Sequence, residues 1–404
     1  MTNNPIITKV ANSQTILLQW LKDAGHSNIL TVADTNTAVF AKGERLLTLS
    51  PTPDNSCLIP DETAIGKILI AAAGMQAIVA VGSGTICDLV RYVSSRLGLT
   101  YYVVATAASM DGYTSSVSAL IVDSVKQTYP ATAPAGVITD PSIYETAPTD
   151  LVSAGFGDMM GKFTSVTDWE MEGLLYPNAG DFCQNLATEM RSTAESCCKD
   201  KETMNALIKS GLIMQKAGHS KPASGSEHHL SHFWEMRGIP ALHGTKVGVA
   251  TLVVLQAQEW LLTEDIDWTQ KEFNLREWTN DIHRCYGPAA NDIIKLWPDE
   301  NTSTRAALIE RIRNNWSGLR KILSQNVGLR PKLEKAIADM GGAISPTEIG
   351  IDQATFISGV LHSNRLRRRF TTWRLLDLLG LLSLYAKRLF ALPPPPLQER
   401  LYPK

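Results

Sequence analysis

The sequence predicts an α/β domain with a parallel, Rossmann-like sheet, followed by an all-helical domain. In the first third of the chain, short apolar runs alternate with segments of helical periodicity, as in strands that are joined by crossover helices. After Pro148 the apolar residues keep helical spacing to about Phe390, and no segment has the pattern of a strand. We therefore expect the α/β domain over residues 1–148 and the all-helical domain over residues 149–404.

Each element of the α/β domain is predicted from a local pattern. Helical periodicity predicts helices over residues 13–24 and 63–73. Apolar runs predict strands over residues 28–33, 77–81 and 101–105, with further strands over 118–122 and 136–139. The alternation of strands and helices favours a parallel sheet.

Composition excludes several classes of protein. The 404 residues are enough for two separate cores, and 38 basic against 40 acidic side chains give no general attraction for nucleic acid or acidic membranes. Six cysteines without a disulfide pattern suit a reducing cytosol. The N-terminus lacks a signal-peptide pattern, and charges interrupt the apolar stretch 375–392. We expect a cytoplasmic protein with neither a nucleic-acid nor a membrane partner.

A glycine turn after the predicted strand 77–81 is the first candidate binding site. Gly82, Ser83 and Gly84 precede a helix that is expected to begin near Thr85. Glycines allow the backbone to approach a pyrophosphate closely, and the N-terminus of a helix favours its negative charge. The spacing is not that of the usual G-x-G-x-x-G motif, so a purely structural turn is the alternative.

Two other polar segments follow predicted strands. Asp34 could accept hydrogen bonds from an adenosine ribose, or it could be a turn or helix-capping residue. The loop 106–115 carries small hydroxyl residues at the carboxyl end of a strand, where open α/β sheets bind ligands. A plain connecting loop is the alternative for this second segment.

Histidines are concentrated in one part of the helical domain. Four of the eight lie between residues 228 and 243; His228 and His232 share one helical face, whereas His229 points elsewhere. Asp158 lies upstream in a glycine-rich segment. One Asp and two His suit Zn²⁺, Ni²⁺ or Fe²⁺ and leave coordination positions open, as in catalytic metal sites. Lys162 would point toward the same cavity or into solvent.

A basic run at residues 365–369 is interpreted as a solvated helix face. Because the chain has no wider basic surplus, we reject nucleic-acid binding.

With these residues in view, the chain resembles the superfamily of iron-containing alcohol dehydrogenases and dehydroquinate synthases. Within it, the resemblance is to the bacterial type of sn-glycerol-1-phosphate dehydrogenases, and it covers most of the chain. The motifs that carry it are Val81-Gly82-Ser83-Gly84-Thr85 with Asp88, Thr106-Ala107-Ala108-Ser109-Met110-Asp111-Gly112, Gly155-Phe156-Gly157-Asp158, Ser224-Gly225-Ser226-Glu227-His228 with His232, and His243-Gly244 with Val247-Gly248.

The resemblance implies roles for individual residues. Three residues would hold one divalent metal ion: Asp158, His228 and His243. NAD or NADP would contact Gly82, Ser83, Gly84, Thr85, Asp88, Thr106, Ser109 and Ser115, with Asp34 as the ribose candidate. The substrate would contact Asp111, Asp158 and His232, and we expect Lys162 and the region of Arg368 and Arg369 near its phosphate. Asp158 and His232 are the catalytic candidates.

The activity implied is hydride transfer between NAD(P)H and a small polyol phosphate, interconverting dihydroxyacetone phosphate and sn-glycerol 1-phosphate. The resemblance also implies a homo-oligomer, a dimer or larger. The alternatives are a glycerol dehydrogenase that acts on an unphosphorylated polyol and a dehydroquinate synthase-like lyase. The Asp111 loop argues against the first, and the scarcity of basic residues between 163 and 225 argues against the second. A degenerate nucleotide-binding sensor is a third alternative, which the complete metal-ligand set disfavours.

Replacing Gly84 with valine tests the proposed nucleotide turn. Gly84→Val should raise the KM for the nucleotide sharply without removing the metal, because a branched side chain would block the approach of the pyrophosphate to the helix N-terminus. Calorimetry with NADH and metal analysis measure the two effects. Unchanged nucleotide affinity would show that the turn is only structural.

Overall fold

A computed structural model describes residues 5–9, 12–51, 58–122, 125–178, 180–269 and 273–390. These residues form two compact units. The first comprises the described residues up to 155 together with 201–218, and the second comprises the described residues from 156 to 200 and from 219 onward. The sequence predicts a boundary between residues 148 and 149. The assignment of coenzyme binding to the part before this boundary and of metal binding to the part after it stays a prediction. The contacts group one late helix, α8 (Thr203–Ala217), with the α/β unit.

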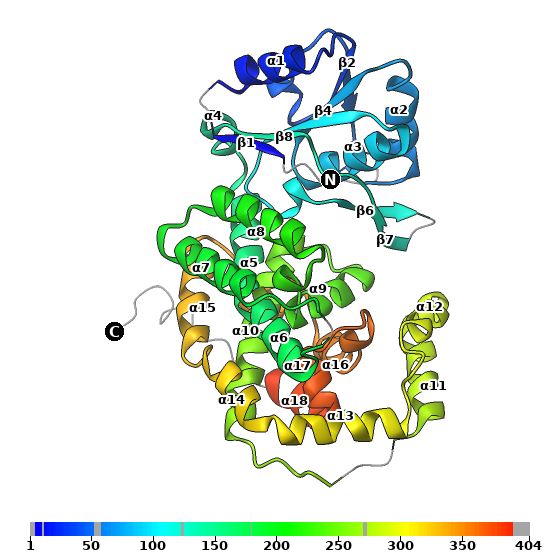
Figure 1. Ribbon diagram of the computed structural model, residues 1–404, viewed down its shortest axis with the longest axis vertical. Helices are drawn as coiled ribbons and strands as arrows, with labels where there is room; N and C mark the ends of the chain where they lie inside the picture. The colour runs from blue at the N-terminus through cyan, green and yellow to red at the C-terminus, as the bar shows by residue number, and fades with distance from the viewer. Residues whose placement is uncertain are drawn as a thin grey trace. The chain divides into compact units, whose positions relative to one another are not determined.

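The first unit is built on a six-stranded sheet with the order β1-β8-β5-β4-β2-β3, in which every pairing is parallel (Figure 1). Its strands are β1 (Ile6–Lys9), β2 (Ile29–Asp34), β3 (Leu46–Leu49), β4 (Ala77–Gly82), β5 (Thr100–Ala105) and β8 (Gly136–Thr139). Every residue of β4 is buried, as is typical of a central strand of a parallel sheet. The predicted α/β fold with a parallel sheet is confirmed.

Four strands, β1, β3, β6 and β7, depart from the sequence prediction. β1 and β3 form the two edges of the sheet and were not predicted, because they are short and partly exposed and so lack a long apolar run. The predicted strand 118–122 exists as β6 (Val117–Val122) but pairs in antiparallel fashion with β7 (Val125–Pro130) in a separate hairpin. Strand propensity alone does not specify the pairing partner.

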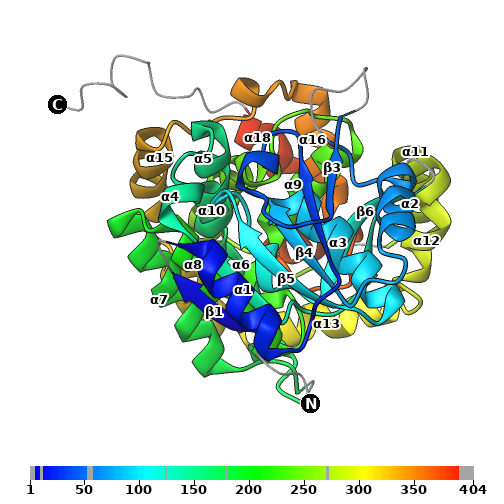
Figure 2. The same cartoon turned by 90° about the horizontal axis from the view of Figure 1, so that it is seen from above.

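Helices pack against the sheet of the first unit (Figure 2). α1 (Ser13–Asp23) buries Leu17 and Leu21 in a cluster with Val79, Val81 and other strand residues. Successive side chains in a strand point to opposite faces, so Ile78 and Ala80 are directed to the other face of the sheet. The other helices of this unit besides α8 are α2 (Glu62–Ala71), α3 (Gly84–Leu97) and α4 (Pro141–Tyr144).

Among the residues that the structure describes, the regular elements of the second unit are all helices, as predicted. Its longest helix, α10 (His243–Thr263), is buried along most of its length because its apolar residues surround it on all sides. The other helices are α6 (Lys162–Leu175), α7 (Gln184–Asp200), α9 (Ser226–Met236), α11 (Leu275–Tyr286), α12 (Ala290–Lys295), α13 (Thr302–Asn314), α14 (Trp316–Ser324), α15 (Leu329–Asp339), α16 (Gln353–His362), α17 (Thr372–Leu378) and α18 (Leu382–Phe390). The chain passes from the first unit to the second within α5 (Thr149–Met160).

Among the described residues, no helix is long and apolar enough to cross a membrane.

Glycines allow α5 and α10 to approach each other at backbone distance. A Cβ atom on Gly157 would lie 2.5 Å from the Gly244 carbonyl oxygen and 3.4 Å from Cα of Gly248. Because both of these neighbours are backbone atoms, a side chain here could be accommodated only if the helices moved apart. The contact brings the end of α5 against the start of α10, and these helix ends carry Asp158 and His243.

Gly157→Ala should therefore destabilise the protein by about 1–3 kcal/mol, as overpacking of a close contact does. Gly66→Ala is the matched control, since Gly66 lies inside α2 and a Cβ atom there would have no neighbour within 4 Å. In the control, the free energy of unfolding should rise by roughly 0.5–1 kcal/mol, because alanine has a higher helix propensity than glycine. Thermal and denaturant unfolding measure both changes, and equal behaviour of the two variants would contradict the close helix contact.

Candidate active site

The two predicted nucleotide segments lie together at the carboxyl edge of the sheet. Gly82 ends β4, and the neighbouring β5 ends at Ala105 in register with it. The Thr106 amide donates to the Gly82 carbonyl at 3.2 Å, and α3 begins at Gly84 directly after Ser83. The turn and the loop thus meet where parallel sheets bind ligands. Whether they contact a nucleotide stays a prediction.

A buried arginine that was not predicted from the sequence joins these segments. The Arg91 guanidinium forms an ion pair with Asp88 on the same helix and donates to the Val117 carbonyl at 2.9 Å and to the Gly112 carbonyl. Its Nε donates to the Tyr101 hydroxyl at 3.0 Å. An arginine on the apolar face of a predicted helix, three residues after an aspartate, was the available signal. Arg91 holds the segment 112–117 against α3.

The remaining predicted residues of the first unit have local partners. Asp34 Oδ1 accepts from the amides of Asn36 and Thr37, both at 2.8 Å, which is the turn arrangement that the sequence left open. Asp111 Oδ2 accepts from Ser210 on α8 at 3.0 Å, and the Ser115 hydroxyl accepts from the Val117 amide at 3.1 Å. These bonds order the loops, and contacts of Asp34, Asp111 and Ser115 with a ligand stay predictions.

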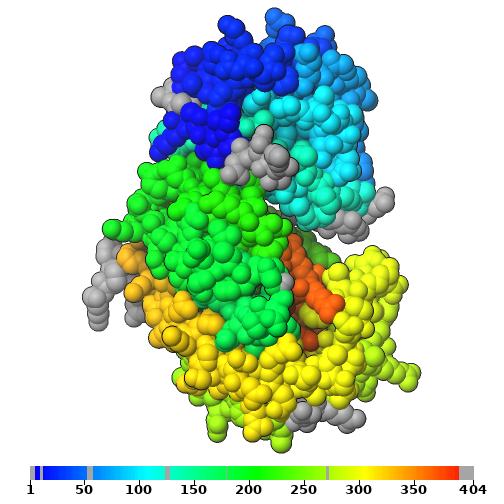
Figure 3. Space-filling model, in the orientation of Figure 1, coloured from blue at the N-terminus to red at the C-terminus, as the bar shows by residue number. Residues whose placement is uncertain are grey.

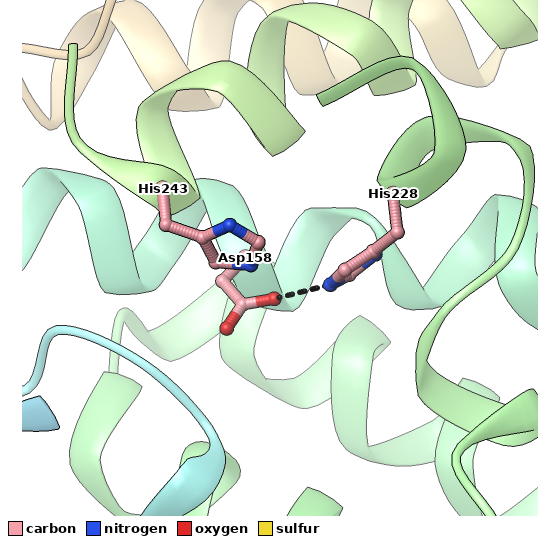
Figure 4. A group of neighbouring side chains, drawn as sticks. All are labelled: Asp158, His228 and His243. Atoms are coloured by element: carbon pink, nitrogen blue, oxygen red, sulfur yellow. Dashed lines mark ion pairs between the residues drawn. The ribbon is translucent and has the colours of Figure 1, made fainter. Parts of the chain in front are cut away.

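The predicted ligand triplet comes together in the second unit. Asp158 lies in the last turn of α5, His228 in the first turn of α9, and His243 is the first residue of α10. One ligand atom from each of the three lies within 4.8 Å of the others (Figure 4). His228 Nε2 is 3.6 Å from Asp158 Oδ1. Helix ends are suitable positions for such ligands, because the side chains there project past the last backbone turn.

Two glutamates orient the histidine rings for metal coordination. Glu227 Oε1 lies 2.8 Å from His228 Nδ1, and Glu235 Oε1 lies 2.8 Å from His243 Nδ1. A carboxylate on Nδ1 fixes the proton there and leaves Nε2 with the lone pair that a metal needs. Burial, together with the Lys162 ammonium, keeps the pKa of His228 well below its usual range, so this ring is neutral. The donor set therefore fits a divalent ion.

Neither glutamate was predicted to be a functional residue. Glu227 was noted only as part of a motif, yet its second oxygen accepts from the Thr164 hydroxyl at 2.6 Å and its first accepts from the Gly225 amide at 2.7 Å. Burial raises the pKa of Glu227, although Thr164 opposes the rise. Glu235 lies one helical turn after His232, and that spacing was the available signal.

Glu235 also holds the predicted catalytic histidine. Its Oε2 is 3.1 Å from His232 Nδ1, and burial and the Arg367 guanidinium lower the pKa of His232 to about 4. Although burial would raise it, the neighbouring His243 and His232 rings keep the pKa of Glu235 well below its usual range. One carboxylate thus holds two imidazole rings.

Lys162 points inward, as predicted, and is not solvated. Its ammonium donates to Asp158 Oδ1 at 2.7 Å and to the Ala223 carbonyl at 3.1 Å, and both charged side chains are buried. His229 is also fully buried, and neither of its ring nitrogens has a hydrogen-bond partner among the described residues.

The basic run is not a helix face, so that interpretation is wrong. Residues 366–371 form a non-helical segment between the short helix η6 (Ser363–Arg365) and α17, and two of the arginines turn inward. Arg367 Nη2 is 3.3 Å from His232 Nε2, and Arg369 donates to the Ser224 carbonyl. Arg368 instead is exposed and pairs with Asp299 at 2.7 Å, away from the histidines.

Comparisons with known proteins agree with this architecture. A family model described as iron-containing alcohol dehydrogenase matches residues 15–148. A probable glycerol dehydrogenase from Sinorhizobium meliloti shares the fold, with a TM-score of 0.61 at 13% identity over 96% of this chain and 99% of that one. Fold and site together define a two-unit dehydrogenase of the iron-containing alcohol dehydrogenase class.

Relatives with higher sequence identity indicate one family within this class of dehydrogenases. Glycerol-1-phosphate dehydrogenase, NAD(P)+, from Geobacillus stearothermophilus is 30% identical over 385 residues, which are 88% of each chain. The protein of the same name from Halalkalibacterium halodurans is 37% identical over 273 residues, 60% of this chain and 68% of that one. This chain belongs to the glycerol-1-phosphate dehydrogenase family.

His228→Ala should remove most of the bound metal while leaving the protein folded, because the site loses one of three ligands. Metal analysis after gel filtration, with circular dichroism to follow the fold, measures this outcome. His229→Ala is the adjacent control and should retain its metal, because the His229 ring is not part of the ligand triplet. Stoichiometric metal in His228→Ala would contradict the assignment.

Proposed function

We propose that this chain reduces dihydroxyacetone phosphate to sn-glycerol 1-phosphate, with NAD(P)H as hydride donor and a divalent metal ion in the active site. The observation that carries the proposal is the Asp158, His228 and His243 group with its carboxylate-oriented rings. The names of relatives that match most of the chain supply the substrate and the coenzyme.

The proposed roles follow the sequence predictions. The metal ligands are Asp158, His228 and His243. The coenzyme is held by Gly82, Ser83, Gly84, Thr85, Asp88, Thr106, Ser109 and Ser115, with Asp34 toward the ribose. The substrate is held by Asp111, Asp158 and His232.

When bound, a divalent ion supplies Lewis acidity toward the substrate oxygen at C2. The ammonium of Lys162, 2.7 Å from Asp158, holds that carboxylate in position. When glycerol 1-phosphate is oxidised, a hydride is transferred from C2 to the nicotinamide, and the C2 hydroxyl must also lose its proton. His232 is the proposed acceptor at Nε2, and Glu235 on its Nδ1 stabilises the positive charge that the ring gains.

The second candidate is a glycerol dehydrogenase, because solved structures with the same fold include enzymes of that name. Those structures are 13% identical to this chain and share its fold alone. We further propose a homo-oligomer that acts on a small molecule in the cytoplasm.

The choice of substrate is tested by comparing two ketones. Catalytic efficiency, kcat/KM, should be at least about a hundredfold higher for dihydroxyacetone phosphate than for dihydroxyacetone, because a site that binds phosphate leaves buried groups unpaired without it. NADH and NADPH oxidation with each ketone gives the ratio, and chiral analysis of the product identifies the sn-1 isomer. Equal efficiencies, or a preference for dihydroxyacetone, would assign the chain to the glycerol dehydrogenases.

A further inference from the structure

Two inward-pointing arginines converge on one serine beside the histidine cluster. Arg367 Nη1 donates to the Ser224 hydroxyl at 3.2 Å, while Arg369 Nη1 donates to the Ser224 carbonyl. Arg369 Nη2 donates to the Ser220 hydroxyl at 2.8 Å. These acceptors are all neutral, so the protein orients both guanidinium groups without a direct carboxylate contact.

The two positive charges lack a close counterion within the described part of the chain. Neither guanidinium has a carboxylate oxygen within the 4.0 Å of an ion pair, whereas the exposed Arg368 between them does. Burial, and next the charge of Arg367, lower the pKa of Arg369 to about 10, and burial also lowers the pKa of Arg367. Both arginines are half-buried, and an anion between two like charges in such a site reduces their mutual repulsion.

Both groups retain hydrogen-bond donors for such an anion. A guanidinium has five N–H donors in a planar fork that matches phosphate oxygens. Arg367 uses one N–H on Ser224 and one toward His232, and Arg369 uses one on each of two serines. The remaining donors have no partner among the residues that the structure describes.

These arginines lie next to the proposed reaction centre. Arg367 Nη2 is 3.3 Å from His232 Nε2, and the His232 ring lies 5.4 Å from the His243 ring and 5.9 Å from the His228 ring, centroid to centroid. Figure 3 shows orange-red atoms at the floor of a hollow between green and yellow parts of the chain. Arg367 and Arg369 are themselves partly exposed, so a small anion can reach them from solvent.

Hydrogen bonds to Asp168 also fix the end of the segment that carries Arg367 and Arg369. Asp168 on α6 accepts from the amide and the hydroxyl of Thr372, each at 2.8 Å, and its other oxygen accepts from the Ser226 amide at 2.7 Å. Asp168 therefore joins the start of α17 to the start of α9. The arginines just before Thr372 are fixed relative to His228 and His232 on α9.

We propose that Arg367 and Arg369 form a fork that binds the phosphate monoester of the substrate and so selects phosphorylated over unphosphorylated ketones. Two guanidinium charges match a phosphate monoester, which carries about −1.5 to −2 at neutral pH. The proposal rests on the proposed function and revises the phosphate contacts that the resemblance implied for Lys162 and Arg368. Lys162 is directed to Asp158 and Ala223, and Arg368 is directed to Asp299, so neither takes part in the fork.

The deciding variants are Arg367→Gln and Arg369→Gln. Arg368→Gln is the matched control, because Arg368 belongs to the same basic segment. Each of the first two should lower kcat/KM for dihydroxyacetone phosphate about 10- to 100-fold, the usual effect of losing a charged hydrogen bond. For Arg369→Gln, kcat/KM for dihydroxyacetone should change less than about threefold, because that ketone has no phosphate. Arg367→Gln also removes the contact with His232, so its efficiency should fall with both ketones, but more with the phosphorylated one. Arg368→Gln should resemble the wild type with both ketones.

Binding without turnover provides an independent measurement. Calorimetry with inorganic phosphate and with glycerol 1-phosphate, in the absence of nucleotide, should show weaker binding to the two fork variants by a similar factor. Arg367→Lys and Arg369→Lys keep the charge but lose the planar fork, so they should retain an intermediate affinity. If a glutamine variant does not fold, its lysine counterpart decides the question.

Several outcomes would overturn the fork. Equal losses with both ketones would show that the arginines support the site only structurally. A raised KM for NADH with unchanged ketone kinetics would assign the bound phosphate to the nucleotide. If the wild type prefers dihydroxyacetone phosphate and the fork variants keep that preference, the fork is wrong while the proposed function stands. If the wild type does not reduce this ketone but loses phosphate affinity in the variants, the proposed function fails while anion binding at the fork stands.

Discussion

The hydrogen bonds of a single carboxylate, that of Glu235, organise the candidate active site. One oxygen holds His243 and the other holds His232, so a predicted metal ligand and a predicted catalytic residue share one support. The two histidines come from different helices, α10 and α9, and rigid helices alone do not determine how their rings rotate. Because the carboxylate accepts a hydrogen bond from Nδ1–H of each ring, the lone pair lies on Nε2. It is directed to the ligand triplet in His243 and to Arg367 Nη2 in His232. Loss of this bridge would free both rings at once.

The charges around this bridge are buried and mutually dependent. Glu227 and Asp168 are carboxylates in the interior whose oxygens accept several hydrogen bonds from hydroxyl and amide groups. Lys162 compensates Asp158 directly, whereas Arg367 and Arg369 contact only neutral acceptors. The Asp158–Lys162 pair is thus balanced internally, whereas Arg367 and Arg369 retain charge for the proposed anionic ligand. The same interior keeps His228 neutral, which suits a metal ligand.

In the first unit, the geometry of the sheet positions the predicted nucleotide-binding segments. Parallel pairing of β4 with β5 brings the ends of two strands, which are separated by the whole of α3, to one edge. Buried Arg91 then ties the following loop back to α3 through backbone carbonyls. The predicted nucleotide segments are thus held by backbone register and one internal cation, which leaves their small residues without bulky side chains that would obstruct a ligand.

The sequence by itself determined the parallel α/β part, the helical part and the central strands, because apolar periodicity is a local pattern. The triplet Asp158, His228 and His243 was implied by the resemblance to a known family, and its role as a metal site stays a prediction. For Lys162 the sequence left open whether the side chain faces the site or solvent. Only the tertiary structure decided which side chains support these residues. Glu235 meets His243 across two helices, Arg91 meets carbonyls more than twenty residues away in the chain, and Arg367 reaches His232 from a distant segment. The edge strands and the separate β6–β7 hairpin were equally undetermined, since strand pairing and the burial of a charge depend on residues remote in sequence, whose approach no local pattern specifies.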